Sequence, residues 1–170
     1  MKFLSLLFFI LFLSKVSFAQ VGKVEIDSAN NDKLTSMVQS IELQVTKGDI
    51  LGISFDFDRY SSRTQTLYAL ILKVSTGSVL SFVERDSCIF TINKNISFAL
   101  KSVYVDAFFK DTTYNNWIHF DYPQNILSLL QKISSLEIKL YNLGQIYEAK
   151  MREEDVQRFN EYMKEYITLK

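Results

Sequence analysis

Residues 51 to 58 alternate between apolar and polar side chains. The apolar positions are Leu51, Ile53, Phe55 and Phe57, and the polar positions are Ser54, Asp56 and Asp58. Because successive side chains of a strand point to opposite faces, a repeat of two predicts a strand with one buried and one solvated face. Such strands are typical of antiparallel sheets.

Much of the remaining chain reads as further strands that end at turn residues. We expect them within 23–46, with a polar break at 30–32, and at 66–74, 79–84, 88–92, 96–109, 114–121, 136–141 and 145–151. Short turns between successive strands predict an antiparallel meander.

Two segments repeat at helical spacing instead. The first lies near 123–133, where Pro123 suits the first turn of a helix because its missing N–H is not needed there. The second covers 153–168, with three acidic residues in its first turn and an apolar stripe along one side. We therefore expect an α+β fold, in which a curved, mostly antiparallel sheet carries the C-terminal amphipathic helix on one face.

Residues 1–19 have the pattern of a secretory signal peptide. Lys2 gives a positive start, an apolar run of eleven residues follows, and Ser17 and Ala19 supply small residues before a cleavage site. We expect cleavage after Ala19, which leaves a single globular domain at 20–170. An uncleaved anchor is the alternative, although the run is shorter than the roughly 20 apolar residues that span a bilayer. No later segment predicts a membrane span.

Composition limits the compartment and the partners. The leader takes away Lys2 and Lys15, so 17 basic and 19 acidic residues remain, and this near-neutral balance argues against nucleic acid as a partner. Cys88 is the only cysteine, so no internal disulfide can form. A small exported domain without a disulfide favours a bacterial periplasm or cell exterior over a eukaryotic secretory route.

The only histidine is the strongest candidate for catalysis. His119 and Asp121 share one face if residues 114–121 form a strand, and an Asp can orient a His for proton transfer. No nucleophile motif accompanies them. One histidine and no calcium-loop pattern predict no metal site, and no sequence pattern indicates a cofactor.

Aromatic residues gather around the same histidine. Tyr114, Trp117 and Tyr122 flank His119 within a polar stretch, and Tyr and Trp combine large contact area with a polar tip. These four residues are the predicted surface for a ligand or partner, with packing at a sheet edge as the alternative.

Together these patterns favour an exported, non-enzymatic binding or interaction domain. Its partner is expected to be another envelope protein or a small apolar ligand held between sheet and helix. A secreted hydrolase that uses His119 and Asp121, and an inhibitor or immunity-type protein that acts on a secreted enzyme, are the two alternatives.

Overall fold

A computed structural model of the chain describes residues 20–167 apart from residues 28, 31, 81, 84 and 85. The predicted leader at 1–19 lies outside the described residues. The strands are β1 (Gly22–Asp27), β2 (Asp32–Met37), β3 (Ile41–Lys47), β4 (Gly52–Ser61), β5 (Thr66–Thr76), β6 (Ser87–Ile92), β7 (Ile96–Lys110), β8 (Thr113–Asp121), β9 (Leu136–Asn142) and β10 (Gln145–Met151). The helical elements are the 3-10 helix η1 (Gln124–Leu130), the α-helix α2 (Glu153–Tyr162) and the π-helical turn η2 (Met163–Ile167).

Eight of these strands form a closed barrel. Their order is β4-β3-β10-β9-β6-β7-β8-β5, and β5 pairs back onto β4 with antiparallel register from Gly52↔Ser75 to Ser61↔Thr66. The predicted α+β fold with an open, curved sheet is therefore wrong. The simple meander is wrong too, because β5 pairs with β8 instead of β6. Register shifts between β7 and β8, at Val103, and between β3 and β10, at Thr46, add local bending, which helps the sheet to close.

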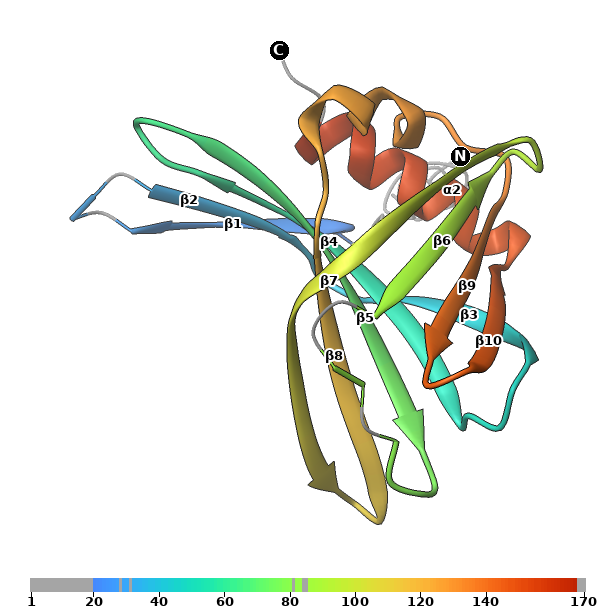
Figure 1. Ribbon diagram of the computed structural model, residues 1–170. Helices are drawn as coiled ribbons and strands as arrows, with labels where there is room; N and C mark the ends of the chain where they lie inside the picture. The colour runs from blue at the N-terminus through green and yellow to red at the C-terminus, as the bar shows by residue number, and fades with distance from the viewer. Residues whose placement is uncertain (1–19, 28, 31, 81, 84–85, 168–170) are drawn as a thin grey trace, which may run out of the picture.

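The barrel wall continues beyond the ring as a hairpin of β1 and β2, which we call the arm (Figure 1). β2 and β3 pair with the same edge of β4, at its two ends, so together they behave as one bent strand. Among the described strands, β1 pairs with β2 alone. The outer edge of β1 is thus unpaired within the part of the chain that the structure describes.

The helix η1, and α2 with the turn η2 that continues it, lie at one end of the barrel (Figure 1). Phe159 of α2 packs edge-on against Phe55 of β4, with ring centroids 5.4 Å apart. The Tyr162 hydroxyl donates a hydrogen bond of 2.6 Å to the Phe57 carbonyl. The predicted C-terminal helix therefore exists, but it covers an end of a barrel and does not lie on the face of an open sheet. The predicted short helix is the 3-10 helix η1.

The strand predicted at 79–84 is wrong, since the described residues of this segment are not in a strand. In the ring, β8 and β7 lie between β5 and β6, so the connection has to pass two strands before β6 begins. Its described valines, Val79 and Val83, are exposed, whereas Phe82 packs inward. Phe82 is buried and lies 6.1 Å from the ring of Tyr147 on β10.

Aromatic side chains fill much of the barrel interior. Tyr122 contacts Phe57 and Phe98 edge-on, with centroids 5.3 Å and 5.7 Å away, and Phe90 meets Phe120 at 6.1 Å. These contacts link β4, β6, β7 and β8 through the interior. None of the helices in the described residues has the length and hydropathy needed to cross a membrane.

Candidate functional site

The four residues of the predicted aromatic surface do not lie together. Alternation along β8 places Trp117 and His119 on the outer face of the barrel, with Asp121 beyond them. Tyr114 lies near the far end of β8, where its ring packs 4.9 Å from that of Phe109. Tyr122 is buried inside the barrel, and its hydroxyl donates to the Ile126 carbonyl. The single surface that the sequence suggested is divided among three places.

The surroundings of His119 are aromatic and partly shielded from solvent. Its ring lies 5.3 Å from that of Tyr104 on β7. Desolvation lowers the pKa of His119 from its ordinary value, while the charge of Asp106 acts in the opposite direction. None of the hydrogen bonds of the described residues joins His119 to Asp121, so the predicted role of this pair in proton transfer stays a prediction.

A charged cluster lies on the same outer face, centred on Lys73 of β5. The ammonium contacts the Asp56 carboxylate at 2.5 Å, donates to the Ser40 hydroxyl at 2.9 Å and lies 5.2 Å from the Trp117 ring. Burial, and then the charge of Asp56, raises the pKa of Asp58 to about 6. Lys73 is well satisfied, but Asp56 Oδ1 and Asp58 Oδ1 are buried without a hydrogen-bond partner among the described residues.

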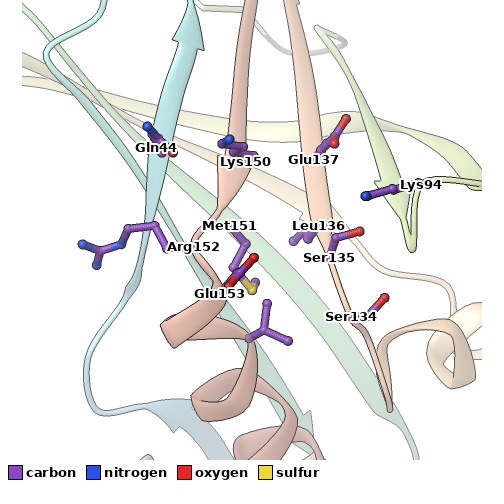
Figure 2. A pocket seen from close by; sticks show the side chains of 11 residues that line it. Gln44, Lys94, Ser134, Ser135, Leu136, Glu137, Lys150, Met151, Arg152 and Glu153 are labelled. Atoms are coloured by element: carbon purple, nitrogen blue, oxygen red, sulfur yellow. The ribbon is translucent and has the colours of Figure 1, made fainter.

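The strongest candidate site is a groove of about 560 Å³ on the outer wall beside the start of α2 (Figure 2). It runs across the ends of β9 and β10 and is bounded by the start of α2 and by the turn between β6 and β7. Its apolar lining is Leu136, Met151 and Val156. Its polar lining is Gln44, Lys94, Ser134, Ser135, Glu137, Lys150, Arg152 and Glu153.

Cross-strand register positions the polar side chains of the groove. Lys150 of β10 stands opposite Gln44 of β3 on one side and Glu137 of β9 on the other. These neighbours share a face because directly paired residues point the same way. Among the described residues Lys150 and Glu137 form no ion pair, so both charges remain available.

The turn between β6 and β7 supplies the opposite rim. Asn93 and Lys94 both adopt left-handed backbone conformations, with φ of 53° and 66°. The Asn93 side-chain carbonyl accepts hydrogen bonds from the Ser134 N–H at 2.6 Å and the Ser134 hydroxyl at 3.0 Å. This turn therefore fixes the serine pair and presents Lys94 at the groove (Figure 2).

One buried polar group of the groove lacks a hydrogen-bond partner among the described residues. The Ser135 hydroxyl oxygen is buried and accepts or donates no hydrogen bond within the described structure. A buried polar group that is left unpaired costs about 1–3 kcal/mol, so a ligand that bonds to it would gain this energy.

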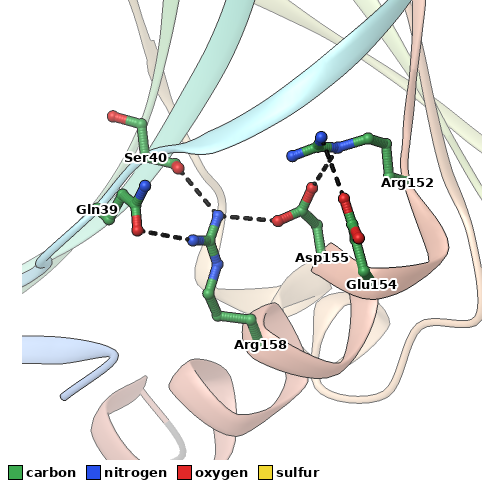
Figure 3. Close-up of polar contacts among 6 residues, drawn as sticks. All are labelled: Gln39, Ser40, Arg152, Glu154, Asp155 and Arg158. Carbon is green, nitrogen blue, oxygen red and sulfur yellow. Dashed lines mark hydrogen bonds and ion pairs between the residues drawn. The ribbon is translucent and has the colours of Figure 1, made fainter. Parts of the chain in front are cut away.

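A buried carboxylate fixes the helix wall of the groove (Figure 3). Asp155 accepts from Arg152 Nε at 2.9 Å and from an Arg158 terminal nitrogen at 2.9 Å. Arg158 also donates to the Gln39 side chain and to the Ser40 carbonyl, both at 3.0 Å. The network ties the start of α2 to the link between β2 and β3, and so it holds Glu153 at the groove.

A second, apolar pocket of about 290 Å³ lies near the turn between β7 and β8. Tyr114 lines it, together with Phe108 and Phe109 of β7 and Val79, Leu80 and Phe82 of the connection before β6. Here a residue of the predicted aromatic surface, Tyr114, borders a hollow. The space between helix and sheet, where a ligand was expected, is occupied by packed side chains such as Phe159.

The groove could not be predicted from the sequence, because its residues come from five separated stretches. The sequence predicts the strands at 136–141 and 145–151, but nothing in it indicates which of their side chains adjoin. The nearest signal was the run from Arg152 to Asp155, whose charges border the groove.

Among the described residues, no group of three or more His, Cys, Asp and Glu side chains could hold a metal ion. No protein family, curated protein or solved structure compared with the chain matches it. Its function is therefore argued from geometry.

Proposed function

We propose that the chain is an exported binding protein whose groove holds an extended polar segment with charges of both signs, such as a peptide. The observation that carries this proposal is the combination in one groove of a buried, unpartnered Ser135 hydroxyl with lysines and glutamates that form no ion pair. Leu136, Met151 and Val156 add an apolar floor.

A peptide fits this chemistry in three ways. Its backbone N–H and C=O groups can pair with the Ser135 hydroxyl, which both donates and accepts. Its own charged groups can meet Lys94 or Lys150 and Glu137 or Glu153. Its short apolar side chains can cover the floor. Ligand sites commonly combine an apolar surface with a few convergent polar groups.

The proposal includes export of the protein from the cytoplasm. The apolar run after Lys2 and the small residues before Gln20 support a cleaved leader and an extracytoplasmic location. There the partner would be an envelope protein that presents an exposed segment.

The test is an NMR titration of the purified protein with two peptides, Lys-Ala-Ala-Glu and its acetylated, amidated Gln-Ala-Ala-Gln counterpart. We expect the charged peptide to shift the amide resonances around Ser134–Leu136 and at the turn of Lys94, and the neutral one to bind at least about tenfold more weakly. Lys150→Gln should weaken binding, whereas Lys132→Gln, an exposed residue outside the groove lining, should not. Equal binding by all forms, or no shift at the groove at millimolar peptide, contradicts the proposal.

A second candidate is a small apolar ligand in the Tyr114 pocket. Val79 and Phe109, which line it, are 64% and 62% exposed, and large apolar side chains gathered at a hollow favour an apolar ligand. Fluorescence of 1-anilinonaphthalene-8-sulfonate should rise on addition of native protein and fall by at least half with Phe109→Ser, while Leu143→Ser, exposed at another turn, leaves it unchanged. An unchanged signal with Phe109→Ser argues against this site.

A further inference from the structure

No described strand pairs with the outer edge of β1 at any position. The register between β1 and β2 runs without a shift from Gly22↔Met37 to Asp27↔Asp32, so no bulge turns this edge away. The strand contains no proline, and no described strand pairs with its other side. Such an edge is a template for pairing with another strand unless the sequence opposes it.

The two faces of β1 differ in character. Lys23 and Glu25 point to one face and form an ion pair of 2.6 Å. Gly22, Val24 and Ile26 alternate with them and belong to the other face. Val24 and Ile26 are 49% and 59% exposed, so the arm presents apolar side chains beside its free edge.

We propose that β1 pairs with β1 of a second copy of this chain, antiparallel and centred on Val24. In this register Lys23 stands opposite the partner's Glu25, and Glu25 stands opposite the partner's Lys23. Opposite charges directly across a sheet stabilise the pairing, whereas like charges oppose it. A register centred on Lys23 places Lys23 opposite itself. A register centred on Glu25 places Glu25 opposite itself, although it also sets Lys23 opposite the partner's Asp27. Of these three registers, only the one centred on Val24 pairs opposite charges without a like-charged pair.

The apolar face supports the same register. It places the partner's Ile26 opposite Gly22, which has no side chain. A Cβ atom at Gly22 would lie 2.8 Å from the Tyr162 ring and 2.9 Å from the Tyr166 ring, so these two rings cover the strand at this point. The partner's Ile26 would pack beside the aromatic pair. The two-fold axis repeats every contact, as in most homodimers.

The arm is suited to this pairing because it projects beyond the barrel (Figure 1), which lets a second copy approach its edge. The dimer would join the two sheets into one without using the groove. This inference is therefore independent of the proposed ligand.

The test measures mass by sedimentation velocity and light scattering over a range of protein concentrations. We expect the wild-type protein to dimerise as its concentration rises. Lys23→Glu alone and Glu25→Lys alone each create two like-charged pairs across the interface, and each should weaken the dimer at least about tenfold. The double variant K23E/E25K restores opposite charges and should dimerise like the wild type.

The decisive sample is an equimolar mixture of the two single variants. One strand then carries two glutamates and the other two lysines, so a heterodimer forms where neither variant forms a homodimer. Circular dichroism of each variant checks folding. A wild type that stays monomeric at millimolar concentration, or a dimer that neither single variant weakens, overturns the proposal.

Discussion

Asp58 is a carboxylate on the barrel wall whose environment opposes its charge. Burial is the main cause and Asp56 the second, while Lys73 and Lys23 counteract them. The folded protein therefore holds the Asp58 proton more tightly than the unfolded chain does. Tighter proton binding by Asp58 stabilises the folded state. This stabilisation is fully present below the unfolded pKa near 4 and is lost as the pH rises through the folded pKa of about 6.

We expect Asp58→Asn to raise the free energy of unfolding at pH 7 by roughly 1–2 kcal/mol, allowing for partial solvent screening. Urea denaturation at pH 4, 5, 6 and 7 should show that the variant loses less stability than the wild type across this interval. Asp121→Asn, an exposed carboxylate two strands away, is the control. An identical pH dependence for wild type and Asp58→Asn contradicts the argument.

The sequence predicts that the acidic residues at 153–155 lie in the first turn of a helix, but it does not reveal that Asp155 is buried. Three acidic residues open α2, as a helix N-terminus favours. Two of them are exposed, but Asp155 is buried between two arginines. Helical periodicity could not distinguish it from Glu154, because the β2–β3 link that covers it is more than 100 residues away in the chain.

Asp155→Ala should therefore lower the free energy of unfolding by roughly 2–4 kcal/mol, because it leaves Arg158 with part of its network and no counter-charge. Glu154→Ala removes an exposed neighbour of the same charge and should change stability by less than about 0.5 kcal/mol. Chemical denaturation of the two variants side by side measures the difference. Equal losses would mean that the buried network contributes nothing beyond the charge of the first turn.

At the scale of elements, two glycine turns allow the cost of backbone strain to be measured apart from the cost of steric overlap. Gly48, between β3 and β4, has φ of +102°, and a Cβ there would overlap the Tyr147 ring. Gly144, between β9 and β10, has φ of +81°, but a Cβ there meets nothing within 4 Å. Both need the left-handed conformation that glycine adopts freely.

Gly144→Ala should lower stability by about 1 kcal/mol, from the backbone alone. Gly48→Ala should lose about 2–4 kcal/mol, because the Tyr147 ring must also move. Thermal and chemical unfolding of both variants gives the comparison. A Gly48→Ala loss no larger than that of Gly144→Ala would show that the ring moves without penalty.

Most elements could be predicted from alternation, because a repeat of two directly records which side of a strand is buried. In β4, Ile53, Phe55 and Phe57 are buried as expected, whereas Leu51 is exposed before the strand begins and Ser54 is buried. In β8, Trp117 and His119 lie on the same outer face, as expected. The strand predicted at 79–84 is absent because a loop residue that packs against the interior, such as Phe82, gives the same apolar signal as a strand residue. Alternation also says nothing about which strands meet, so neither the pairing of β5 with β8 nor the groove between β9, β10 and α2 could be derived.

At the scale of the molecule, closure of the barrel protects its interior as a unit. Cys88 in β6 is fully buried between β7 and β9, and burial raises the pKa of its thiol well above the usual value. A buried, protonated thiol reacts only when the structure opens.

We therefore expect a disulfide reagent such as dithionitrobenzoate to react with native protein on the order of 1,000-fold more slowly than with protein in urea. Destabilising variants such as Gly48→Ala should speed the reaction about tenfold for each 1.4 kcal/mol of stability that they lose. A rate that does not depend on global stability would show that the wall near β6 opens locally.

The arm and the barrel share a strand, and this has a mechanical consequence. β4 runs from its pairing with β3 in the ring to its pairing with β2 in the arm without a break. The arm has no hinge of its own through which it could swing as a separate body. A pull on the arm along β4 is transmitted as shear to the hydrogen bonds between β4 and β5, which break together and not one at a time. Force applied to the arm therefore acts directly on the barrel wall through β4.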